Sequence, residues 1–85
     1  MVKYFHYMKK GISIMQQKIL QYIYKHFKET GKPLCYVIFN QIDNNTSAVK
    51  NSIKNLEEEG FIETSHPAIG AIYASLTDYG LSFFE

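Results

Sequence analysis

The chain has 85 residues, which is enough for one domain and too short for two. Hydrophobic residues make up 46% of it, including 7 Tyr and 6 Phe, so we expect a packed core rather than a disordered chain. The single cysteine excludes an internal disulfide and a cysteine metal cluster. No apolar run reaches the length of a membrane span or a signal-peptide core, so we expect no membrane contact and a cytoplasmic location.

Charge is distributed unevenly along the chain, although the formal net charge is only +1. All nine basic residues are lysines, and the last of them is Lys54. Residues 1–56 hold the nine lysines against Glu29 and Asp43, which gives +7, whereas residues 57–85 hold six acids and no lysine, which gives −6. This distribution predicts a basic side that fits nucleic-acid phosphates, with an ordinary solvated surface as the alternative.

Residues 1–12 form a tail that combines basic and aromatic side chains without clear periodicity. Lys9 and Lys10, with Lys3, lie close in sequence to an aromatic run at residues 4–7. Lysines interleaved with aromatic rings are typical of surfaces that stack single-stranded nucleic acid, and a basic arm along a DNA backbone is a second interpretation. A third is a dimerisation or core-packing segment, on which we base the expectation of a homodimer.

The sequence after the tail predicts a long first helix over residues 14–30. Ser13 and Gln16 have the spacing of a capping box, in which each side chain bonds the other residue's backbone N–H. Apolar residues then recur at helical spacing, at Ile19, Leu20, Ile23 and Phe27. Gly31 and Pro33 favour the end of the helix.

The segment that follows is ambiguous between helix and strand. We expect a short strand at residues 34–35 and a second helix over residues 36–43. Val37 and Ile38 are strand-forming residues, so a strand is the alternative. The helix is favoured because residues 43–45, Asp-Asn-Asn, have the composition of a turn that leads into another helix.

That third helix is predicted over residues 47–59, with Asn45 or Thr46 as its N-cap. Its apolar positions lie on one face, at Val49, Ile53 and Leu56. Gly60 follows as a residue suited to the left-handed conformation that ends many helices. We therefore expect one buried and one exposed face.

Two strand-like runs follow the third helix, at residues 61–65 and 71–76, with a turn predicted at residues 66–70. Their length and separation predict a hairpin. Thr77 and Asp78 then favour the start of a short final helix, because threonine caps helix N-termini and an acid is stabilising in the first turn.

Two motifs flank this hairpin. LEEEGFI, at residues 56–62, has the pattern L-x-x-x-G-apolar-apolar, and LTDYG, at residues 76–80, has the pattern L-T-x-x-G. In this order and at this separation they resemble the winged helix-turn-helix superfamily, in particular small bacterial regulators of the MarR type. The resemblance implies an α+β fold over residues 13–85: a three-helix helix-turn-helix core, a two- to three-stranded β wing and a short C-terminal helix. It also implies sequence-specific binding of double-stranded DNA by a small transcriptional regulator.

In such proteins the third helix enters the DNA major groove. The candidate DNA-binding residues at its start and along its outer face are Thr46, Ser47, Lys50, Asn51 and Lys54. Lysine contacts guanine or phosphate, asparagine makes a bidentate contact to adenine, and serine contacts either base type. Three glutamates at residues 57–59 repel a duplex, so we expect the N-terminal half to face DNA. An ordinary solvated helix face is the alternative.

The sequence shows no catalytic or metal-binding pattern. The three histidines are scattered, without a cysteine or carboxylate at ligand spacing. No nucleophile–base pair or phosphate loop is found, so we expect neither an enzyme nor a bound cofactor or metal. Cys35 is expected to be a small buried residue rather than a redox sensor.

Two other functions stay open. The abundance of Lys, Ile, Asn and Tyr without arginine is typical of AT-rich coding, as in a low-GC bacterium or a mobile element. The lysine-free wing and the aromatic tail suit single-stranded DNA, so a single-stranded DNA-binding protein in the replication of a mobile element is the first alternative. The second is a protein-interaction adaptor that uses exposed aromatic residues as its contact surface.

Overall fold

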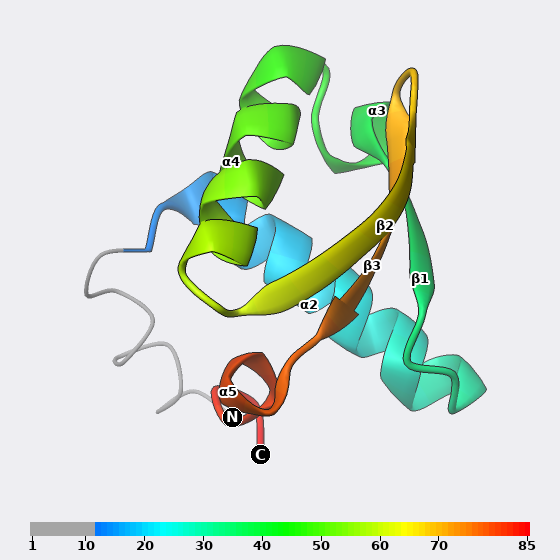
Figure 1. Ribbon diagram of the computed structural model, residues 1–85, viewed down its shortest axis with the longest axis vertical. Helices are drawn as coiled ribbons and strands as arrows, with labels where there is room; N and C mark the ends of the chain where they lie inside the picture. The colour runs from blue at the N-terminus through cyan, green and yellow to red at the C-terminus, as the bar shows by residue number, and fades with distance from the viewer. Residues whose placement is uncertain (1–11) are drawn as a thin grey trace.

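The computed structural model describes residues 12–85, which form an α+β fold with four helices and a three-stranded antiparallel sheet (Figure 1). The elements in chain order are α2 (Ile14–Thr30), β1 (Cys35–Ile38), α3 (Phe39–Ile42), α4 (Thr46–Glu58), β2 (Ile62–Ala68), β3 (Ala71–Leu76) and α5 (Asp78–Leu81). The strand order is β1-β3-β2. None of these helices is both long and apolar enough to cross a membrane.

Helix α2 has the bounds and the capping that its sequence predicts. The Ser13 backbone N–H donates to Gln16 Oε1 at 2.8 Å, and the Gln16 N–H donates to Ser13 Oγ at 3.1 Å, so both bonds of the capping box are present. At the other end Gly31 adopts φ 73° and donates its N–H to the Phe27 carbonyl at 2.8 Å. Local side chains and backbone therefore define both ends of the helix.

The helix predicted over residues 36–43 is present only at residues 39–42, and the prediction is wrong for residues 36–38. Strand β1 occupies Cys35–Ile38, leaving Leu34 outside, and the second helix is the single turn α3 that begins at Phe39. The reason is non-local, because β1 pairs along its whole length with β3, more than thirty residues away in the sequence. Val37 and Ile38 suit that pairing, so their strand propensity and the tertiary hydrogen bonds act together.

Helix α4 begins at Thr46, because Asn45 is the N-cap and its side chain accepts a hydrogen bond from the Ala48 N–H at 3.2 Å. It ends one residue earlier than predicted. Gly60, at φ 87°, and Phe61 then return their N–H groups to carbonyls of the last turn at 3.1 and 2.9 Å. This pair of bonds is a Schellman motif, which directs the chain from α4 straight into β2.

The hairpin of β2 and β3 is longer than predicted. Residues 66–70 do not form one turn, since β2 continues almost to the apex and only residues 69–70 connect the strands. The pairing shifts register where His66, at φ 51°, and Pro67 are accommodated as a bulge. Proline is tolerated here because β2 is an edge strand and the missing N–H costs no internal hydrogen bond.

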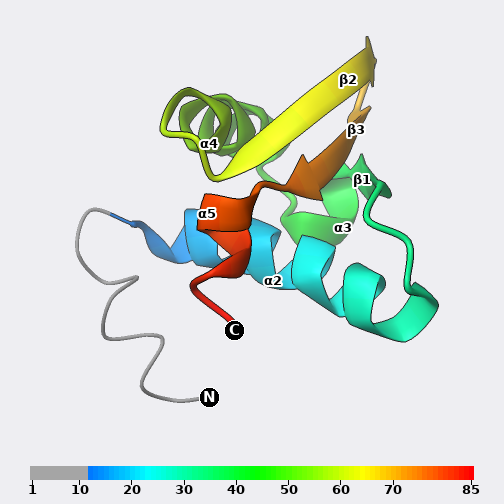
Figure 2. The ribbon, with the colours of Figure 1, turned by 60° about the horizontal axis from the view of Figure 1, so that its bottom comes forward.

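The core lies between the helices and one face of the sheet. Figure 2 shows α2 running along this face, with α4 beside β2. The predicted inward face of α4 is confirmed, because Val49, Ile53 and Leu56 are 0%, 3% and 0% exposed. They pack with other fully buried side chains: Ile19, Leu20, Ile23, Val37 and Ile62.

Helix α5 closes the lower end of the fold in Figure 1. Thr77 caps it as predicted, with its side chain accepting from the Gly80 N–H at 3.1 Å, and also bonds the Gly60 and Phe61 carbonyls. The Thr77 N–H donates to the Phe61 carbonyl as well, at 3.0 Å. The last residues then cover α2, where the Phe84 ring stacks on Tyr24 at 4.3 Å between centroids.

Candidate nucleic-acid interface

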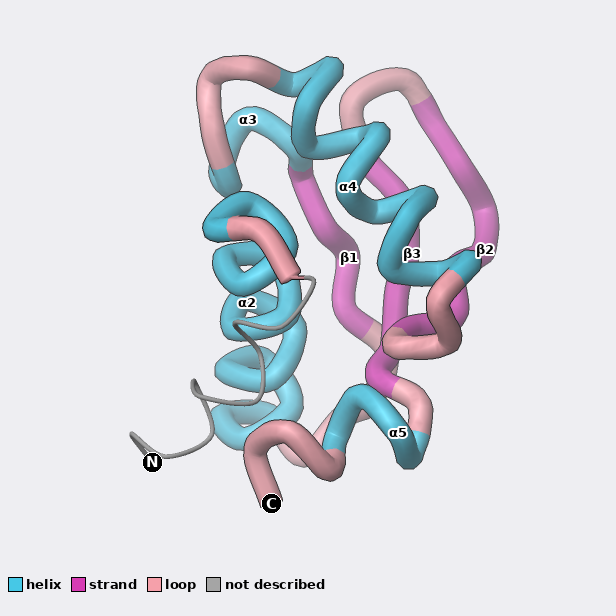
Figure 3. The backbone as a smooth tube through the Cα atoms, turned by 90° about the vertical axis from the view of Figure 1, so that its left-hand side faces the viewer, coloured by secondary structure: helices cyan, strands magenta, loops and turns pink. Residues whose placement is uncertain are grey.

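A groove separates α4 from the apex of the β2–β3 hairpin. One part, about 510 Å³, is lined by Phe39, Thr46, Ser47, Lys50 and residues 67–70. The adjoining part, about 280 Å³, is lined by Phe39, Lys50, Asn51, Ile53, Lys54, Pro67, Ala68, Ala71 and Ile72. We call both parts together the α4–hairpin groove. Figure 3 shows the start of α4 and the hairpin loop at the same end of the molecule.

Five predicted site residues meet in this groove. Ser47, Lys50, Asn51 and Lys54 recur at helical spacing, and with Thr46 they are exposed along the side of α4 that faces the hairpin. The buried face of α4 fixes this orientation, because turning these side chains inward would expose its apolar residues. The other two predicted site residues, Lys9 and Lys10, lie outside the described residues.

Among the described lysines, those of the groove are unpaired, as are Lys25 and Lys32, whereas two others form ion pairs. Lys18 pairs with Asp43 at 3.4 Å, and Lys28 pairs with Glu85 at 3.2 Å. Within residues 12–85, neither Lys50 nor Lys54 has a hydrogen bond or an ion pair, and no acid lines the groove. Their two positive charges are therefore available to a ligand.

The turn before α4 is held by a carboxylate. Asp43 accepts a hydrogen bond from the Asn45 backbone N–H at 2.9 Å and contacts Lys18. The Asn45 bond is the largest influence that lowers the pKa of the Asp43 carboxyl, and the hydrogen bond and charge of Lys18 lower it further. The ionised carboxylate thus links α2 to the turn that orients the N-terminal end of α4.

The acidic residues of α4 lie at the opposite end from this turn. Residues 57–59 close the helix, and Glu57 accepts a hydrogen bond from the Thr64 hydroxyl at 2.9 Å. Eight residues separate Lys50 from Glu58, which corresponds to about 12 Å along a helix. Lys50 is therefore well separated from the acids, whereas Lys54 lies three and four residues before Glu57 and Glu58 and is their neighbour on the helix surface.

The hairpin apex is a part of the groove to which the sequence analysis gave no role. Ile69 is 105% exposed, more than any other large hydrophobic residue of the described chain. The apex is nevertheless held in place, because the Gly70 carbonyl accepts a hydrogen bond from the Phe39 N–H at 2.9 Å. An isoleucine directly before a glycine in a predicted turn was the available sequence signal, but its position opposite α4 depends on tertiary pairing.

A second exposed feature lies on the sheet. Tyr36 of β1 and Tyr73 of β3 face each other across the pairing, with ring centroids 4.8 Å apart and exposures of 44% and 36%. His66 approaches the Tyr73 ring edge-on at 6.0 Å. The sequence analysis did not identify this cluster, because Tyr36 was assigned to a helix and the pairing of β1 with β3 was not foreseen.

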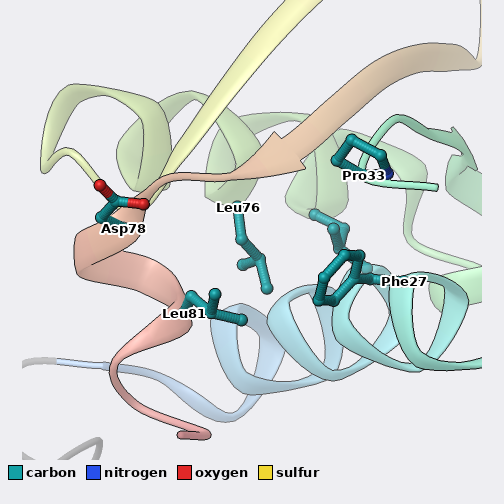
Figure 4. A pocket seen from close by; sticks show the side chains of 6 residues that line it. Phe27, Pro33, Leu76, Asp78 and Leu81 are labelled. Atoms are coloured by element: carbon teal, nitrogen blue, oxygen red, sulfur yellow. The ribbon is translucent and has the colours of Figure 1, made fainter. Parts of the chain in front are cut away.

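A small apolar cavity of about 200 Å³ lies between α2 and the chain around α5 (Figure 4). It is lined by Ile23, Phe27, Pro33, Leu76, Asp78 and Leu81. This volume is below the range of about 300–1,000 Å³ that is typical of small-molecule sites. The cavity is therefore a minor gap between packed elements.

Two further kinds of site are in question, a metal site and a reactive cysteine thiol. No group of three or more potential metal ligands comes together within residues 12–85. Cys35 is buried as expected, and burial raises the pKa of its thiol to about 11. The thiolate, which is the nucleophilic form, is therefore scarce at neutral pH.

No known protein family, curated protein or solved structure matches this chain.

Proposed function

We propose that the protein is a winged helix-turn-helix domain that binds double-stranded DNA, with the exposed side of α4 in the major groove. The observation that carries this proposal is the pair of unpaired lysines, Lys50 and Lys54, in a groove without acids. An exposed and unpaired lysine is available to neutralise a phosphate of a polyanion. Neutralising phosphates releases counterions, which drives binding.

The other side chains of the groove supply the chemistry of base recognition. Asn51 offers the bidentate donor and acceptor pair that reads adenine, and Ser47 offers a hydroxyl that reads several bases. Both lie in the N-terminal half of α4, whereas the glutamates at residues 57–59 lie at the other end. A duplex is therefore expected to approach the end of the molecule that carries the groove, away from the acids.

The arrangement of the elements is compatible with a winged helix. Helix α2, β1, the short α3, α4 and the hairpin follow in that order, and the α3–α4 turn is braced by Asp43. We propose that the protein acts as a transcriptional regulator and as a homodimer. Two copies related by a two-fold axis would present two α4 helices to half-sites one DNA turn apart.

Salt-dependent binding tests the proposal. The full chain and its variants are titrated into a fluorescent random-sequence duplex at two salt concentrations. Lys50→Ala and Lys54→Ala should each lower the slope of log K against log salt by about one. Lys25→Ala and Lys32→Ala are matched controls, since these lysines lie outside the groove, and they should leave the slope unchanged. Equal effects in all four variants would contradict the proposal.

Sequence specificity is tested by selection from random duplexes. The parent should enrich a short motif, and Asn51→Ala should lose about 1–3 kcal/mol on that motif and little on other duplexes. A parent that enriches no motif would leave only non-specific binding. A parent that binds neither duplex nor single strands would favour the adaptor function instead.

Single-stranded DNA is a second candidate ligand, and the Tyr36–Tyr73 pair is the observation that favours it. Exposed aromatic rings on a sheet are suitable for stacking unpaired bases. Under this alternative, Tyr36→Ala and Tyr73→Ala would weaken binding to oligo-dT, and Lys50→Ala would not. We favour the duplex because the groove holds two unpaired lysines and no acid, whereas the pocket beside Tyr36 holds Lys25 together with the acid Glu29.

A further inference from the structure

The apex of the β2–β3 hairpin presents an apolar side chain that the fold does not use. Ile69 is 105% exposed, and burying an isoleucine is normally worth a substantial stabilisation. Its neighbours Ala68 and Gly70 are small, so the isoleucine projects alone from a narrow turn. An unused apolar group in this position is available for contact with a ligand.

The apex is also fixed relative to α4. The Gly70 carbonyl accepts a hydrogen bond from the Phe39 N–H at 2.9 Å, at the start of α3. Ala71 pairs with Ile38 on one side and Ala68 on the other, so the sheet extends to the base of the turn. Because these contacts order the backbone before binding, the apex can act on a ligand without a further ordering cost.

The apex lies across the groove from Ser47 and Lys50, two of the residues that we place on DNA. If α4 lies in the major groove of a duplex, the neighbouring minor groove of that duplex is therefore expected next to the apex. Residues 66–70 include no lysine or arginine. Contact between the apex and DNA therefore cannot depend on the attraction of a lysine or arginine side chain to phosphate. Apolar side chains act on DNA differently, by wedging between base pairs from the minor groove and bending the duplex.

We propose that Ile69 is such a wedge: it enters the minor groove next to the site of α4, partly unstacks one base step and bends the duplex. The proposal rests on the proposed function, since it assumes that α4 holds the duplex. It adds a source of specificity, because pyrimidine–purine steps such as TA unstack most easily. The preferred site should then contain such a step beyond the bases that α4 contacts.

The test measures bending and affinity separately on the selected duplex, labelled at both ends for energy transfer. The parent should shorten the end-to-end distance. Ile69→Ala should abolish the shortening and weaken binding about ten-fold, with an unchanged salt slope because no phosphate contact is lost. Ile14→Ala is the matched control, since Ile14 is 74% exposed and lies outside the groove, and it should bend and bind as the parent does.

Each outcome decides between the two proposals. If Ile69→Ala binds and bends the duplex as the parent does, the wedge is wrong and duplex binding by α4 stands. If the parent binds the duplex without shortening it, the wedge is also wrong. If the parent does not bind duplex DNA at all, both proposals fail together. Thermal melts of both variants should match the parent, because both isoleucines are exposed.

Discussion

Gly80→Ala should destabilise the protein strongly although it replaces glycine by the best helix former. Gly80 lies in α5 and packs against the backbone of Phe61, the residue directly before β2. A Cβ at this position would overlap the Phe61 carbonyl oxygen and would lie 3.1 Å from the carbonyl carbon and 3.3 Å from Leu76 Cδ2. The backbone cannot yield easily, because Phe61 is bonded to α4 through its N–H and to Thr77 through its carbonyl.

The magnitude follows from three contributions. Overpacking costs about 1–3 kcal/mol. Displacing the Phe61 carbonyl weakens the bonds that it accepts from the Thr77 N–H and hydroxyl, at about 0.5–1.5 kcal/mol each. The helix propensity of alanine returns about 1 kcal/mol. The three contributions sum to a loss of about 1–5 kcal/mol with a midpoint of about 3 kcal/mol, and this midpoint corresponds to a fall in Tm of about 12–24 °C for a domain of this size.

Gly31→Ala is the control for this experiment. Gly31 has φ 73° and no atom within 4 Å of an added Cβ, so its substitution costs only backbone strain of about 1–2 kcal/mol. Both variants and the parent are followed by circular dichroism during heating. Gly80→Ala should melt below Gly31→Ala. A Gly80→Ala protein that melts with the parent, or above it, would refute the packing of α5 on Phe61.

Leu56→Ala should cost about 2–5 kcal/mol in urea unfolding, because Leu56 is 0% exposed, and a loss under about 1 kcal/mol would contradict the packing of α4. Cys35, buried and with its thiol pKa raised to about 11, should react with a disulfide reagent at pH 7 only after unfolding, so rapid labelling of the native protein would count against its burial. Asp43 has a lowered carboxyl pKa, so its contribution to stability is present above its unfolded pKa of about 3.9 and is lost as the pH falls through the lower folded value. Melts at pH 6 and pH 3 should therefore show a smaller acid loss for Asp43→Asn than for the parent, and equal losses would exclude this role.

The elements that the sequence predicted well are those whose signals are local. Ser13, Gln16 and Gly31 satisfy their own helix ends, so α2 has the predicted bounds. The signals of α4 are also local, with a cap at Asn45 and a Schellman turn at Gly60, and its observed bounds differ from the predicted residues 47–59 by one residue at each end. The exposed face of α4 followed directly, since its buried face fixes the direction of the candidate DNA-binding residues.

The features that the sequence did not predict depend on distant partners. Residues 35–38 became a strand because β3 supplies hydrogen bonds, and no local pattern reveals that pairing. For the same reason the Tyr36–Tyr73 cluster was not foreseen. The hairpin apex was located only roughly, since a bulge at His66 lengthens β2, and its position opposite α4 depends on the bond between Phe39 and Gly70.

The central claim is that duplex DNA occupies the α4–hairpin groove, and backbone amide shifts measured during titration with a short duplex test it most directly. The largest shifts should fall at residues 46–54 of α4 and residues 67–70 of the apex, with small shifts at residues 57–59 and on β1. Largest shifts at Tyr36 and Tyr73, or none in α4 while the duplex binds elsewhere, would contradict it.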